Sequence, residues 1–127
     1  MNTKSFLASG LVFMVLAIAF GAFGAHAIRA LATAQQMTTW QTASEYHFYH
    51  ALGLMGLGIW MENKPNSRLI TTCGLLLIIG LVLFSGSLYL LVLSGNTGLG
   101  IITPIGGVIL MLAWLCWLLA VLTARSM

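Results

Sequence analysis

The sequence predicts an all-α membrane protein, an antiparallel bundle of four transmembrane helices in one domain over residues 1–127, with both termini cytoplasmic. Of the residues, 60% are hydrophobic and only 6% are charged, whereas charged residues make up about 25% of an ordinary soluble domain. The apolar residues also gather into four segments, which predict helices over residues 5–27, 42–61, 69–93 and 103–124. These observations exclude a soluble globular domain.

The distribution of charge limits the classes of partner. The net charge of +3 comes from five Lys and Arg residues scattered among the apolar segments. No basic run is present that could follow a phosphate backbone, so nucleic acid is excluded as a partner. Cys73 and Cys116 stand alone on different segments, which is typical of buried thiols rather than of a zinc or redox motif. The predicted environment is the lipid bilayer of the cell inner (plasma) membrane, crossed several times.

The first predicted helix carries a stripe of small residues. Its apolar run of about 20 residues is longer than the hydrophobic region of a cleaved signal peptide, so we expect it to span the membrane. Residues on the stripe should let another helix approach closely; they are Gly10, Ala17, Gly21 and Gly24. His26 and Arg29 follow at the end of this helix.

The second predicted helix begins with the densest group of ionisable residues in the chain, between Glu45 and His50. The apolar run after it covers only about 17 Å of a hydrocarbon core of roughly 30 Å, so the polar half must enter the membrane. On a helical wheel, the opposite arc of Phe48, Leu52, Met55 and Ile59 is typical of a lipid face. The wheel therefore turns Glu45, Tyr46, Tyr49 and His50 inward and leaves His47 at the boundary.

The third and fourth helices add hydroxyl groups. Ser85 and Tyr89 share one face at a spacing of four residues. Thr103 precedes Pro104, as an N-cap precedes the first residue of a helix. Ser85 and Tyr89 are more typical of hydrogen bonds between membrane helices than of ligands.

Basic residues predict the orientation. With four spans, Lys4, Lys64, Arg68 and Arg125 fall on one side and Arg29 alone on the other, so the termini should be cytoplasmic. This topology brings polar residues of all four helices to one level near the outer leaflet. The candidate residues for binding a ligand or a partner are His26, Arg29, Glu45, Tyr46, His47, Tyr49, His50, Ser85, Tyr89 and Thr103. No catalytic residue is identified.

Four motifs carry a family resemblance over nearly the whole chain. They are residues 21–26 (GAFGAH), 40–52 (WQTASEYHFYHAL), 84–89 (FSGSLY) and 102–107 (ITPIGG). In this order they resemble the YgdD-like family of small bacterial inner-membrane proteins, which has a mitochondrial relative. The chain departs from the family pattern at Ala113, where glycine is favoured. The resemblance implies a four-helix inner-membrane protein and supplies no activity and no catalytic residues.

Three interpretations of the polar cluster stay open at this point. The groups can hydrogen-bond one another and fix the helices in register, with Glu45 neutralised by Arg29 or protonated. They can recognise a lipid headgroup, a small ligand or a partner helix, in a non-enzymatic binding or assembly module. Alternatively, His47 and His50 could share a metal, His26 and His50 could ligate haem, or the cluster could serve a quinone or a proton path of the respiratory membrane. The cofactor, the metal and the choice between a membrane-protein partner and a homo-oligomer stay open.

Overall fold

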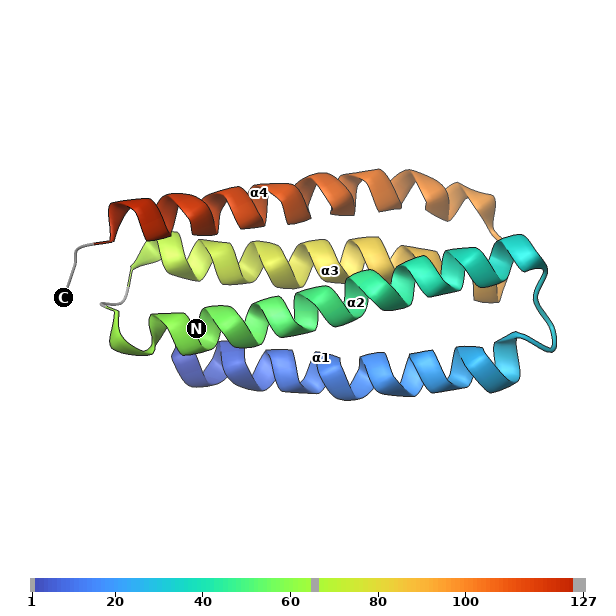
Figure 1. Ribbon diagram of the computed structural model, residues 1–127. Helices are drawn as coiled ribbons and strands as arrows, with labels where there is room; N and C mark the ends of the chain where they lie inside the picture. The colour runs from blue at the N-terminus through green and yellow to red at the C-terminus, as the bar shows by residue number, and fades with distance from the viewer. Residues whose placement is uncertain (1, 65–66, 125–127) are drawn as a thin grey trace.

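The computed structural model describes residues 2–64 and 67–124, and over them the chain forms four long antiparallel helices (Figure 1). α1 (Thr3–Phe23) continues into a π-helical turn, η1 (Gly24–Ile28), and is followed by α2 (Ala34–Trp60) and the short turn η2 (Met61–Asn63). α3 (Arg68–Ser94) leads through the 3-10 turn η3 (Thr97–Ile101) into α4 (Ile102–Thr123). α1 packs along α2, α2 along α3 and α3 along α4.

Side-chain caps explain where the helices begin. α2 starts at Ala34 rather than at residue 42, because Thr33 and Gln36 form a reciprocal capping box. Ser67 caps α3 by accepting a hydrogen bond of 3.1 Å from the backbone N–H of Ile70. Thr103 does not cap α4, since η3 runs directly into that helix and Thr103 lies inside it. The polar segment before residue 42 is therefore part of a long helix.

Small residues bring the helix backbones together. The predicted stripe on α1 faces α2: a Cβ on Gly10 would lie 2.9 Å from the carbonyl oxygen of Ala51. A Cβ on Gly106 of α4 would lie 2.5 Å from the backbone nitrogen of Phe84 on α3. Contacts this close admit no larger side chain.

The core is divided into two clusters along the bundle. The cluster nearer the start of α1 surrounds Phe6, Leu54 and Leu77. There the sulfur atoms of Cys73 on α3 and Cys116 on α4 lie 2.9 Å apart, and both residues are free thiols. The other cluster contains Ile28, Trp40, Ala43, Leu88 and Tyr89. It belongs to the level at which the polar candidates were predicted.

The surface of the bundle is typical of a membrane protein. Three stretches are long and apolar enough to span a bilayer, namely Thr3–Ile28, Arg68–Ser94 and Thr97–Thr123. α2 is as long as α3, but its first half is polar. The start of α1 and the end of α4 lie at one end of the bundle (Figure 1). Arg125, which contributed to the predicted orientation, lies outside the described residues.

Candidate functional site

The rotation of α2 decides which polar side chains are internal. His47 and His50 are buried, with 4% and 5% of their surfaces exposed. Glu45, Tyr46 and Tyr49 are exposed, so their predicted inward orientation is wrong. The prediction was right for His50, and His47 lies inside rather than at the boundary. Neutral imidazoles are cheaper to bury than a carboxylate, which favours the observed rotation.

Both ring nitrogens of His50 have partners. Nε2 accepts a hydrogen bond of 3.0 Å from the indole N–H of Trp114 on α4. Because an indole nitrogen can only donate, Nδ1 must carry the proton that is donated to the carbonyl of Tyr46, at 2.7 Å. His50 is thus a neutral imidazole that joins α2 to α4.

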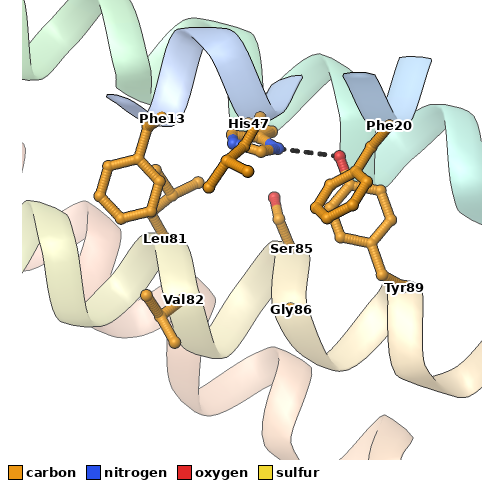
Figure 2. A pocket seen from close by; sticks show the side chains of 9 residues that line it. Phe13, Phe20, His47, Leu81, Val82, Ser85, Gly86 and Tyr89 are labelled. Atoms are coloured by element: carbon orange, nitrogen blue, oxygen red, sulfur yellow. Dashed lines mark hydrogen bonds between the residues drawn. The ribbon is translucent and has the colours of Figure 1, made fainter. Parts of the chain in front are cut away.

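His47 forms the second link, from α2 to α3. Its Nδ1 lies 2.9 Å from the hydroxyl of Tyr89. The dashed line in Figure 2 marks this hydrogen bond. Nε2 is buried and forms no hydrogen bond. The rings of Phe13 and Phe20 pack around the imidazole.

A cavity of about 130 Å³ opens between α1 and α3 beside His47 (Figure 2). Its exposed walls are apolar, since Nε2 of His47 is covered. The lining residues are Phe13, Leu16, Phe20, His47, Leu81, Val82, Ser85, Gly86 and Tyr89. This cavity presents a hydrocarbon surface and no accessible donor or acceptor to a ligand.

The hydroxyl groups of α3 complete the links between helices. Ser85 donates a hydrogen bond of 2.8 Å to the carbonyl of Ala43 on α2. The hydroxyls of Ser87 and Thr103 lie 2.6 Å apart and join α3 to α4. The indole of Trp40 donates to the carbonyl of Phe20 on α1, at 3.0 Å. The buried polar groups of this level thus connect each helix to its neighbours.

Sequence reasoning missed three of these partners. Trp40, Ser87 and Trp114 are not among the candidate residues predicted from the sequence. A buried indole needs an acceptor, and this requirement was the signal that could have directed attention to Trp114.

His26 and Arg29 do not join the imidazoles. Both are exposed at the end of α1. Arg29 lines a separate recess of about 80 Å³ between the end of α1 and the first half of α2, together with Gln41 and Ser44. Within residues 2–64 and 67–124, no three His, Cys, Asp or Glu side chains are grouped as metal ligands.

The exposed face of α2 carries the remaining candidates. Glu45 and Tyr49 lie on it, and neither side chain forms a hydrogen bond or an ion pair with any residue that the structure describes. Leu52 and Ile59 share this face, with exposed fractions of 55% and 60%. Their predicted place on the arc opposite Glu45 is therefore wrong, because at 100° per residue Leu52 lies only about 20° from Glu45. Glu45 therefore presents its carboxylate to the surroundings of the bundle.

Comparison with known proteins defines the family. A family described as "Protein of unknown function (DUF423)" matches residues 20–107. The chain belongs to this family. It is 39% identical to the UPF0382 membrane protein YwdK of Bacillus subtilis over 112 residues, which cover 88% of this chain and 91% of the relative. It is 38% identical to the UPF0382 inner membrane protein YgdD of Escherichia coli K12 over 106 residues, covering 84% of this chain and 77% of the relative. No solved structure matches.

Membership of the DUF423 family confirms the resemblance to YgdD and the location in the inner membrane as a multi-pass protein. The bilayer is accordingly the environment of the bundle. The relatives are described as membrane proteins of unknown function, so the site must be interpreted from its own contacts.

Proposed function

We propose that this protein is a non-enzymatic assembly module of the inner membrane, and that the exposed face of α2 binds a transmembrane helix of a partner. The observation that carries the proposal is Glu45, an exposed carboxylate on a membrane helix that has no partner among the described residues. Ionisable side chains in a bilayer are almost always covered by protein or water. A partner helix would provide that cover.

The depth of Glu45 supports this proposal. Its neighbour Ser44 lies beside Gly21 of α1, as shown by the 3.4 Å from a Cβ on Gly21 to the hydroxyl of Ser44. At 1.5 Å per residue, Gly21 lies about 10 Å inside the end of the α1–η1 helix. A carboxylate exposed to hydrocarbon is unfavourable, by up to about 2.5–3.5 kcal/mol at the bilayer centre. The other three helices are apolar enough to span the bilayer along their length. The N-terminal half of α2, which carries Glu45, is therefore the part of the bundle least suited to contact with lipid.

The internal contacts favour a binding role over a cofactor or a proton path. A metal or haem iron would have to displace one of the two hydrogen bonds of His50, and His26 is exposed at the end of α1. Glu45 and Tyr49 are exposed and form no hydrogen bond with His50 among the described residues, so no hydrogen-bonded path links them. The apolar walls of the cavity between α1 and α3 give a small polar ligand nothing to recognise.

Site-specific photocross-linking in native membranes tests the proposal. We expect a photoreactive amino acid in place of Leu52 to form cross-links to protein. The matched control is Leu115 on α4, with 60% of its surface exposed against 55% for Leu52. Leu115 should cross-link to lipid only. Cross-links to lipid alone from both positions would refute an assembly role.

A further inference from the structure

The exposed face of α2 has the spacing of a helix–helix seam. Exposed or half-buried residues recur at intervals of four and three along it, and we call them the α2 stripe: Glu45, Tyr49, Leu52, Gly56 and Ile59. Alternation of four and three is the pattern by which two helices pack in a left-handed coiled coil. At Gly56 the ring of Trp117 on α4 reaches the edge of the stripe, 3.4 Å from where a Cβ would lie; Glu45, Tyr49, Leu52 and Ile59 are exposed in the described chain.

We propose, building on the assembly role above, that the partner is a second copy of this chain. The two α2 stripes pack against each other about a two-fold axis along the membrane normal. Glu45 of each copy then forms an ion pair with Arg29 of the other. A two-fold interface makes every contact twice, so one acid and one base per chain are sufficient.

Charge complementarity is the reason for choosing a second copy. The chain contains two acids and five bases, and Glu62 lies at the opposite end of α2 from Glu45. At the end of the bundle where α2 begins, Glu45 is thus the acidic residue and Arg29 the basic residue of the described chain. They form no ion pair with each other within the described chain. A different partner would need its own base at this depth, whereas a second copy provides it.

The position of Arg29 fits such a contact. Arg29 lines a recess between α1 and α2 together with Gln41 and Ser44. These two residues lie just before Glu45 on α2, so Arg29 lies beside the N-terminal end of the α2 stripe. Side chains of a helix point toward its N-terminus. Arg29 at the end of the first helix therefore leans into the bilayer, and Glu45 in the first half of α2 leans toward the surface. The two groups approach a common level from opposite directions.

Paired charge reversals test this contact. Glu45→Arg alone and Arg29→Glu alone each place like charges at both contacts of a homodimer. We expect self-association to fall about tenfold or more, as each 1.4 kcal/mol corresponds to one factor of ten. When the two variants are produced together with different tags, every contact of the mixed dimer again joins an acid to a base. We expect copurification of the two tags to return to the parent level.

A second measurement leaves both charges in place, in case a reversal prevents insertion. Leu52→Cys should give a disulfide-linked dimer in membranes under a mild oxidant, while Leu115→Cys and the parent should not. In the photocross-linking experiment described above, cross-links from position 52 to a different protein would refute a second copy as the partner and keep the assembly role. Photocross-links to lipid alone would refute both proposals. A dimer that forms equally well with either single charge reversal would overturn the Arg29–Glu45 pair.

Discussion

His47 and His50 are three residues apart on α2, but their imidazoles join that helix to different neighbours. His47 contacts Tyr89 of α3, and His50 contacts Trp114 of α4. Each contact fixes the height of one helix against another, because an imidazole nitrogen accepts or donates only in the plane of its ring. Two side chains on one turn thus hold three helices in register.

At this scale we predict that Tyr89→Phe destabilises the protein by about 1 kcal/mol, the size of a hydrogen bond between membrane helices. The substitution leaves the ring in place and removes the one hydrogen bond that the buried His47 side chain forms with the described residues. The free energy of unfolding in mixed micelles with SDS measures the effect. Tyr46→Phe is the control, since the Tyr46 hydroxyl has no hydrogen bond with the described residues and its side chain is 39% exposed. Equal losses in the two variants would contradict the prediction.

At the scale of a helix, α2 shows what the sequence could and could not predict. A helical wheel separates Glu45 from His50 by about 140°, and in the structure the first is exposed and the second is buried. The same wheel places Leu52 only about 20° from Glu45, so the predicted lipid face and the carboxylate were already on one side. The wheel does not fix the rotation of the whole helix. Small residues at the contacts determine it: Ala43 and Ala51 are fully buried. Their burial turns the imidazoles inward and the carboxylate outward.

The contact between α3 and α4 gives a prediction for a whole element. In Gly106→Ala the new methyl group would meet the backbone of Phe84 and Leu83, at 2.5 and 2.9 Å, so the two helices must move apart. We expect a loss of about 1–3 kcal/mol, the usual cost of overpacking. Gly86→Ala on α3 is the matched control, because a Cβ there would have no atom within 4 Å. That variant should unfold at the same SDS fraction as the parent or a higher one, because alanine favours a helix by up to about 1 kcal/mol.

For the whole molecule, four antiparallel helices and their common polar level followed from the sequence, because apolar length and the spacing of loops are visible in it. The sequence predicted less well which residues belong to this polar level. Ser85, Tyr89 and Thr103 join it through hydrogen bonds, whereas His26, Arg29 and Glu45 do not. Hydrogen bonds depend on side-chain direction, which the position of a residue along the chain does not give.

The predicted orientation can be tested with single cysteines at the two ends of the bundle. Gly100→Cys lies in η3, and Asn63→Cys lies in η2 at the opposite end. If both termini are cytoplasmic, a membrane-impermeant maleimide should label Gly100→Cys in intact cells and Asn63→Cys only after lysis. The parent is the control for Cys73 and Cys116. The reverse pattern would place the termini in the periplasm.

The two native thiols at the far end of the bundle have a chemical consequence of their own. Cys73 and Cys116 are 43 positions apart in the sequence, and their sulfur atoms touch across the α3–α4 contact. An added lipid-soluble oxidant that accepts two electrons and two protons would convert the two thiols into a disulfide bond between α3 and α4. The last two helices would then form a closed loop in which neither can slide or detach. In purified chain in nanodiscs, this disulfide would be detected as a loss of 2 Da, one hydrogen atom from each thiol.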